Sequence, residues 1–136
     1  MQRISFYLFY GFIWLLTLLP LRVLYFFSDL IYIVIYRVAG YRKKVVFQNL
    51  RDSFPEKSEK EIEKIASDFY KHFCDHFIES FKALHLSKEK HVERFKYVNP
   101  EIVDKYYEQG KSVIAFLGHY GNWEWGALSP ALQLDL

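Results

Sequence analysis

The sequence of 136 residues contains a single cysteine, Cys74, together with one methionine, four prolines and six glycines. One cysteine excludes an intramolecular disulfide and is compatible with a protein that faces the cytoplasm. The chain also lacks paired cysteines and a His-Glu-x-x-His motif. His72 and His76 lie one helical turn apart, but no third ligand of suitable spacing accompanies them, so we expect no metal site.

Hydrophobic residues are abundant, at 51% of the chain, and aromatic residues account for 20%, with eleven Tyr and thirteen Phe. Such a composition is typical of contact with lipid or its interface. The net charge of +2 is unevenly divided: residues 1–57 carry eight basic and three acidic side chains, whereas residues 58–136 carry ten and thirteen. The basic half contains the longest apolar runs, so we expect a membrane partner and no nucleic acid.

The N-terminal segment is the most apolar part of the chain. Ile4–Leu21 has no charged residue over 18 positions, which is near the minimum for crossing a hydrocarbon core of ~30 Å. Pro20 ends this run, and Val23–Tyr36 is apolar again with one acidic residue. We predict a membrane anchor over residues 1–38, made of a spanning helix and an interfacial helix, with a re-entrant hairpin as the alternative. A cleaved signal peptide is disfavoured because no basic n-region precedes a small-residue cleavage site.

The middle of the chain predicts a long helix. Ser58 and Glu61 form a capping-box pattern, and the helix should continue to about Leu84. Apolar and small residues recur at spacings of three and four and predict a stripe facing the core. The residues of this stripe are Ile62, Ile65, Phe69, Phe73, His76, Phe77, Ser80, Phe81 and Leu84.

Alternating strands and helices are predicted for the remainder. Ser87 is expected to cap a short helix over Lys88–Glu93, and Phe95–Val98 has the composition of a short strand. Asn99-Pro100 should begin a further helix that Gly110 ends. With a strand over Ser112–Leu117, this order predicts a parallel βαβ unit with a right-handed crossover.

The segment after the second predicted strand combines an imidazole and a carboxylate at one corner. His119 follows the strand, Gly121 allows a tight turn, and Asn122 is a suitable cap for a helix whose first turn contains Glu124. The carboxyl ends of strands are where open α/β folds commonly hold substrates. The His-x4-Glu spacing alone is weak, since roughly 0.6 such pairs are expected by chance in this composition. The position of this His-x4-Glu pair between a predicted strand and a predicted helix makes a functional role more credible than the spacing does.

The block from Gly118 to Glu124, G-H-Y-G-N-W-E, resembles the active-site block of the late acyltransferases of lipid A biosynthesis. These enzymes belong to the lysophospholipid acyltransferase-like superfamily, which carries a His-x4-Asp/Glu motif. The block from Arg42 to Pro55, R-K-K-V-V-F-Q-N-L-R-D-S-F-P, and the apolar N-terminal segment also resemble that family. The resemblance covers nearly the whole chain.

The resemblance implies an α/β fold, in which an N-terminal transmembrane or interfacial helix is followed by the first part of a glycerolipid-acyltransferase-like αβα domain over residues 39–136. The chain ends at Q-L-D-L, about one helix beyond the corner. We therefore expect a truncated N-terminal portion of a longer enzyme, or a gene fragment, that is inactive alone.

The resemblance also implies the transfer of a fatty acyl chain from acyl carrier protein to a hydroxyl of a lipid A precursor, without metal or organic cofactor, at the cytoplasmic face of the bacterial inner membrane. His119 takes the role of general base and Glu124 that of its carboxylate partner. Amides near Gly121 and Asn122 are candidates for binding the substrate's developing oxyanion. Each has a structural alternative: Asn122 can act only as a helix cap, and Glu124 only as a complement to the helix dipole.

Basic residues follow the anchor, and they allow two compatible interpretations. They are a topology signal and a contact for anionic lipid, worth about 1 kcal/mol per charge near the surface, or a docking site for the acidic acyl carrier protein. These residues are Arg37, Arg42, Lys43, Lys44 and Arg51. Two alternatives to the whole function stay open: another lipid acceptor (an ornithine lipid, a glycolipid or a lysophospholipid), and a non-catalytic membrane-anchored fragment.

Overall fold

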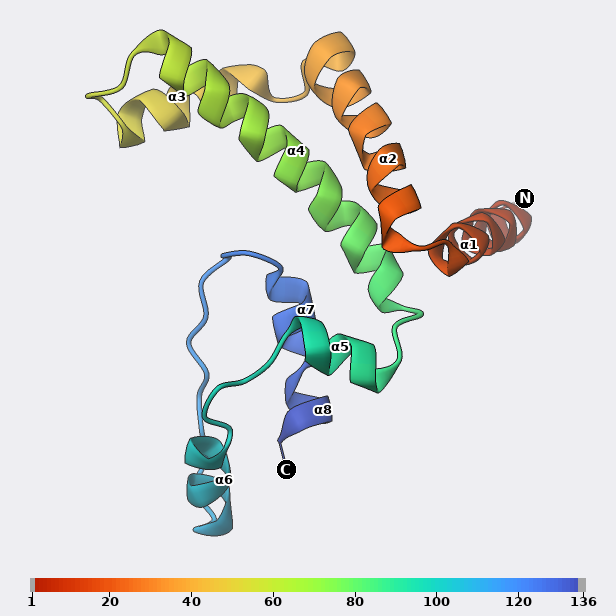
Figure 1. Cartoon of the computed structure of the whole chain (residues 1–136), viewed down its shortest axis with the longest axis vertical. Coiled ribbons are helices and arrows are strands. Elements are labelled where there is room, and N and C mark those ends of the chain that lie inside the picture. The colour runs from red at the N-terminus through yellow and green to blue at the C-terminus, as the bar shows by residue number, and fades with distance from the viewer. Residues whose placement is uncertain (1, 135–136) are drawn as a thin grey trace. The chain divides into compact units, whose positions relative to one another are not determined.

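The computed structural model describes residues 2–134, and every regular element in that range is a helix (Figure 1). The chain divides into two compact units, residues 1–82 and 83–136. The predicted functional boundary after residue 38 lies inside the first unit and stays a prediction. The helices in chain order are α1 (Gln2–Leu18), α2 (Leu21–Tyr32), the π-helix η1 (Ile33–Ala39), α3 (Lys43–Ser53), α4 (Glu59–Ala83), α5 (Lys88–Arg94), α6 (Glu101–Glu108), α7 (Trp123–Leu128) and α8 (Pro130–Gln133).

The predicted α/β fold is wrong for the part of the chain that the structure describes, because neither predicted strand forms. Ser112–Leu117 is exposed and irregular, and no other segment pairs with it. Around Phe95–Val98 the backbone groups that a strand would use bond to a side chain instead: Gln133 donates to the carbonyl of Phe95 at 2.7 Å and accepts from the amide of Tyr97 at 3.0 Å. Strand propensity without a pairing partner does not make a sheet.

The predicted spanning helix over Ile4–Leu21 is also corrected. The first helix, α1, is 17 residues long, and Pro20 is the N-cap of α2. None of the helices within residues 2–134 is, by itself, both long enough and apolar enough to cross a membrane. The segments Leu21–Ala39 and Lys43–Ser53 meet the length and composition criteria only as a pair, with a bend of 93° between them. The break follows Gly40, whose φ of +61° favours glycine.

An aromatic core holds the first unit together. The rings of Tyr32 and Tyr36 stack at 5.4 Å, and Tyr36 packs against Tyr70 of α4 at 5.0 Å. Cys74 completes this cluster, and the Tyr70 hydroxyl donates to the carbonyl of Tyr41. Burial raises the pKa of the Cys74 thiol, so the thiol stays protonated in the core.

The buried face of α4 differs from the predicted stripe. The fully buried residues of the helix follow a spacing of four and are Ile62, Ala66, Tyr70 and Cys74. Three predicted members, Phe69, Phe77 and Leu84, are exposed. The small side chains Ala66 and Cys74 share the buried face with Tyr70, whose ring packs on Tyr36. A pattern based on hydrophobicity alone does not predict that small residues occupy this face.

Two polar contacts fix the ends of helices in this unit. The predicted capping box is confirmed: Glu61 accepts hydrogen bonds from the Ser58 amide at 2.8 Å and from its hydroxyl at 2.7 Å. At the other end, the Lys82 ammonium donates to the carbonyls of Thr17 and Leu19, at 2.6 and 3.0 Å. These carbonyls lie at the end of α1, where no intrahelical donor is available.

Candidate functional site

The corner that carries the sequence motif lies in the second unit. The residues from Lys111 to Gly121 form an exposed run without regular structure, with His119 at a bend. Gly121 has a φ of +60°, the left-handed conformation that glycine adopts without strain. A Cβ added at Gly121 would meet nothing within 4 Å, so the backbone angle and not crowding requires glycine there.

The predicted cap after this turn is confirmed. The Asn122 side-chain oxygen accepts a hydrogen bond of 3.1 Å from the Trp125 amide, and α7 begins at Trp123. Glu124 therefore lies in the first helical turn, as predicted. The cap uses the acceptor oxygen Oδ1 of Asn122, so its backbone and side-chain N–H groups are the donors that this residue could offer to an oxyanion.

The structure places the His119 imidazole against Trp123, with ring centroids 4.7 Å apart and an interplanar angle of 64°. His119 is exposed, and Glu124 is partly buried. In the described chain no hydrogen bond or ion pair joins these two side chains. Their roles as base and carboxylate partner thus stay a prediction.

A buried polar network fixes the helix that follows the corner. His91 of α5 is only 3% exposed, and its Nε2 lies 3.1 Å from both the Trp125 carbonyl and the Ser129 hydroxyl. The Ser129 hydroxyl itself donates to the Trp125 carbonyl at 2.8 Å. With that proton committed, both oxygens act as acceptors toward His91, which requires the proton on Nε2. The network joins α5, α7 and the start of α8.

Residues 95–97 also contact α7, through Tyr97 and Phe95. The Tyr97 hydroxyl donates to the Gly126 carbonyl at 3.2 Å, and the Phe95 ring lies so close to Gly126 that an added Cβ would be 3.0 Å from its nearest atom. A side chain at this position would therefore require the Phe95 ring to shift. Sequence reasoning did not identify His91, Ser129, Tyr97 or Gly126, because their partners lie about 30 residues or more away along the chain.

An exposed imidazole beside a helix whose first turn carries a carboxylate defines a candidate acid–base site of the kind that acyl transfer requires. The family model of bacterial lipid A biosynthesis acyltransferases matches residues 1–133 of the chain. The protein therefore belongs to this acyltransferase family, as its G-H-Y-G-N-W-E block indicated. Comparisons with curated proteins and with solved structures gave no significant match.

Proposed function

We propose that this protein transfers a fatty acyl chain from acyl carrier protein to a hydroxyl of a lipid A precursor, with His119 as general base. The observation that carries the proposal is the family match over residues 1–133, which includes the whole block from Gly118 to Glu124. The exposure of His119 supports it, since a base must reach the hydroxyl of a large amphiphilic acceptor.

The chemistry follows from the residue types. Neutral imidazole removes the hydroxyl proton as the acceptor oxygen attacks the thioester carbonyl, and the proton then passes to the departing thiolate. General-base catalysis of this kind contributes ~10²–10⁴-fold. Glu124 would stabilise the imidazolium, for which the His119 ring must leave Trp123 and approach the carboxylate. Catalytic hydrogen bonds often tighten only when substrate is bound. The amides near Gly121 and Asn122 are the proposed oxyanion donors.

The acyl donor is proposed to dock on basic residues around α3. Arg42 and Lys44 are exposed, and among the described residues no ion pair involves either of them. Arg51, by contrast, is engaged by Glu59 in a bidentate pair, with both N–O distances at 2.8 Å. Arg42 and Lys44 therefore present the charge that an acidic carrier protein would meet, and long-range attraction between opposite charges speeds such encounters.

Membrane contact is proposed for the apolar surface of α1 and α2, where large hydrophobic side chains stay exposed. A surface of this kind exceeds what a protein usually leaves in water. The exposed residues include Ile4, Phe6, Leu8, Phe9, Phe12, Leu15, Leu18, Val23, Phe26 and Leu30. Lipid contact here would keep the protein at the membrane that contains its acceptor, which we propose is the cytoplasmic face of the bacterial inner membrane.

The test is a transfer assay with the complete gene product that carries this sequence, acyl carrier protein loaded with a fatty acid, and a lipid A precursor in detergent, with products weighed by mass spectrometry. We expect His119→Ala and Glu124→Gln each to lower the rate by about 10²-fold or more. His72→Ala is the matched control, because His72 is an exposed histidine on α4 outside the site.

The possible results separate the proposal from its alternatives. Equal rates for His119→Ala and the wild type would show that the imidazole is not the base. Transfer to an ornithine lipid or a lysophospholipid, but not to the lipid A precursor, would assign another acceptor. The absence of transfer by the wild-type gene product to any of these lipids would favour a non-catalytic membrane-anchored role.

A further inference from the structure

The helix that carries Glu124 is too short to hold its own place. It has six residues, Trp123–Leu128, whereas helices shorter than about 12–15 residues are marginal in water without tertiary contacts. Within residues 2–134 the Glu124 side chain makes no hydrogen bond or ion pair of its own. The position of its carboxylate therefore depends on whatever fixes the backbone of α7.

The same helix carries the aromatic ring against which the proposed base lies. The His119 imidazole contacts Trp123, the first residue of α7, with ring centroids 4.7 Å apart. Both the carboxylate assigned to the base and the ring beside the base thus belong to one short helix. A displacement of α7 would change the surroundings of the imidazole in two ways at once.

Hydrogen bonds from α5 hold the backbone of α7 one residue after Glu124. The Nε2 atom of the buried His91 lies 3.1 Å from both the Trp125 carbonyl and the Ser129 hydroxyl. The Trp125 carbonyl also accepts from the Ser129 amide at 3.1 Å and from the Ser129 hydroxyl at 2.8 Å. Three donors therefore converge on this one carbonyl, and the imidazole is the donor that comes from another helix.

Packing acts on the same residue of α7. The Trp125 side chain is 4% exposed, and the His91 ring lies 5.8 Å from it between centroids. The Arg94 guanidinium, also from α5, lies 5.7 Å from the Trp125 ring centroid. His91 thus contributes both a packed ring and a hydrogen-bond donor, whereas an apolar side chain of similar size would contribute only the packing.

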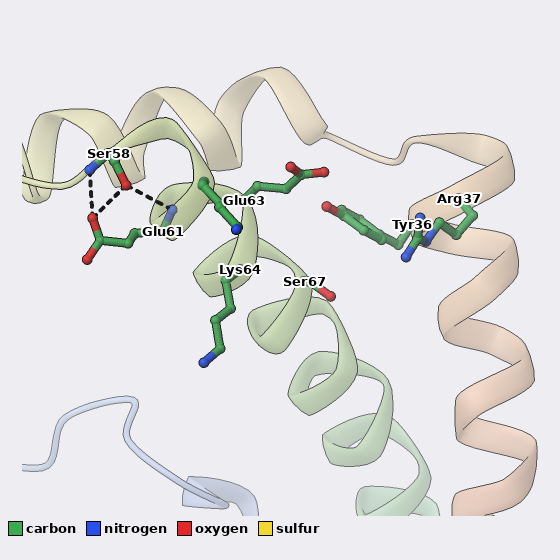
Figure 2. A pocket seen from close by; sticks show the side chains of 8 residues that line it. Tyr36, Arg37, Ser58, Glu61, Glu63, Lys64 and Ser67 are labelled. Atoms are coloured by element: carbon green, nitrogen blue, oxygen red, sulfur yellow. Dashed lines mark hydrogen bonds between the residues drawn. The ribbon is translucent and has the colours of Figure 1, made fainter.

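The capping contact in the first unit shows what is different about this network. Ser58 and Glu61 are exposed and three residues apart, and their hydrogen bonds serve the start of their own helix (Figure 2). His91 is buried and reaches partners 34 and 38 positions away. A buried contact of that range places one helix against another, and hydrogen bonds are stronger away from water.

We propose that His91 is a positioning residue of the acyl-transfer site, with Ser129 as its partner. It holds α7 so that Glu124 keeps the orientation in which its carboxylate can meet the His119 imidazole. This role rests on the function proposed above, and it is exerted through the helix, since His91 itself is buried. Misplacing a catalytic group by about 1 Å can cost about 10²-fold in rate even when the substitution is remote.

The experiment measures kcat and KM separately in the transfer assay with the complete gene product, at a temperature where circular dichroism shows each variant to be folded. His91→Ala should lower kcat by about tenfold and leave KM nearly unchanged. His91→Gln should recover most of the loss, because its amide N–H can donate to the same two acceptors. Lys90→Ala, at the exposed preceding position, is the control and should keep the wild-type kcat.

A double-mutant cycle separates positioning from general destabilisation. If His91 acts through Glu124, His91→Ala in the Glu124→Gln background should change kcat by less than about twofold. Ser58→Ala is the control for stability, because it removes a helix cap in the first unit. It should lower Tm and leave kcat unchanged in the folded protein.

A second variant keeps the test decisive if His91→Ala does not fold. Ser129→Ala removes one of the two acceptors of His91 Nε2 and leaves the Trp125 carbonyl in place. It should lower kcat in the same direction as His91→Ala but by a smaller factor. This loss should again disappear in the Glu124→Gln background.

Two results would overturn the positioning role while leaving the proposed function intact. One is an equal loss of kcat in the wild-type and Glu124→Gln backgrounds, which would assign His91 to general stability. The other is a wild-type kcat for folded His91→Ala, or for Ser129→Ala, while Glu124→Gln is strongly impaired. Wild-type rates for both His119→Ala and Glu124→Gln would instead overturn the proposed function, and the positioning role with it.

Discussion

The two units of this chain are both helical within the described residues, but they differ in the length of their helices and in how much of the chain is packed. The first packs long helices through an aromatic cluster and closes their ends with side-chain hydrogen bonds, such as those of Ser58 with Glu61 and of Lys82 with the end of α1. The second uses short helices and leaves the run from Lys111 to Gly121 exposed. His119, the proposed base, lies on this exposed run, as binding and catalytic residues frequently do.

The second unit itself contains a similar contrast. Glu124 belongs to α7, which the His91 network and the Phe95–Gly126 contact hold in place. His119 lies outside these contacts, on the exposed bend, where its ring contacts that of Trp123. A carboxylate on a fixed helix and an imidazole on an exposed bend would let the base adjust to a substrate while its partner stays oriented.

The largest effect is expected in the core of the first unit. Tyr70→Ala removes a ring that is 1% exposed, together with its hydrogen bond to Tyr41. We expect a loss of about 3–5 kcal/mol in the free energy of unfolding, measured by urea denaturation with circular dichroism. Phe69→Ala is the control, because the neighbouring ring is 44% exposed and its loss should cost about 1 kcal/mol or less. Equal losses would show that the aromatic cluster does not organise this unit.

The next largest effect should fall on the second unit. His91→Ala removes the Nε2 contact to the Ser129 hydroxyl and the Trp125 carbonyl, which keep their bond to each other, and opens a cavity beside α7. We expect a cost of about 2–3 kcal/mol, with faster amide hydrogen exchange over residues 123–129. Lys90→Ala, at the exposed preceding position, should leave that exchange unchanged. If α7 exchanges equally in both variants, the network is not what fixes Glu124.

The turn between His119 and α7 should respond more modestly. Gly121→Ala forces an alanine into the left-handed region and should destabilise the second unit by about 1–2 kcal/mol. Gly118→Ala makes the same chemical change at a glycine without a positive φ and with open space around it. That variant should be neutral or slightly stabilising. Thermal unfolding of both variants measures the difference, and identical Tm values would contradict the assigned backbone conformation.

Local signals in the sequence predicted local structure well. The capping box of Ser58 and Glu61, the cap at Ser87, the cap at Asn122 and the glycine turn at Gly121 all involve groups within three or four residues of each other. Such contacts depend on residue type and spacing, which the sequence displays directly. The turn and the helix start at the candidate site were predicted for the same reason, whereas the strand predicted before them does not form in the described residues.

Features that depend on distant partners were not predictable in this way. A strand over Ser112–Leu117 requires a neighbour, and none forms in the described chain. The face of α4 that is buried is the one on which Tyr70 packs against Tyr36. Hydrophobic spacing alone does not predict that face. His91 gave no signal, since its contacts with Trp125 and Ser129 cross 34 and 38 positions.

The smallest effect concerns the capping box, and its sign depends on pH. The hydroxyl and then the amide of Ser58 lower the pKa of Glu61 below its ordinary value. A carboxyl group whose pKa is lower in the folded state stabilises the fold above its unfolded pKa of about 4.3, and this contribution is lost as the pH falls through the folded value. Glu61→Gln should therefore destabilise the first unit at neutral pH and lose this effect in acid.

Urea denaturation of the wild type and of Glu61→Gln, at neutral pH and at about pH 3, measures how the cost of the substitution depends on pH. Glu56→Gln is the matched control, because Glu56 is an exposed acid in the loop before α4 and makes no capping contact. A pH-independent cost of Glu61→Gln would show that the side chain acts through its shape and not through its charge.

The hydrogen-bonded ion pair of Arg51 with Glu59 lowers the pKa of Glu59 as well. The wild type should therefore retain part of the acid sensitivity after Glu61 is replaced, and Glu59→Gln in that background should remove it.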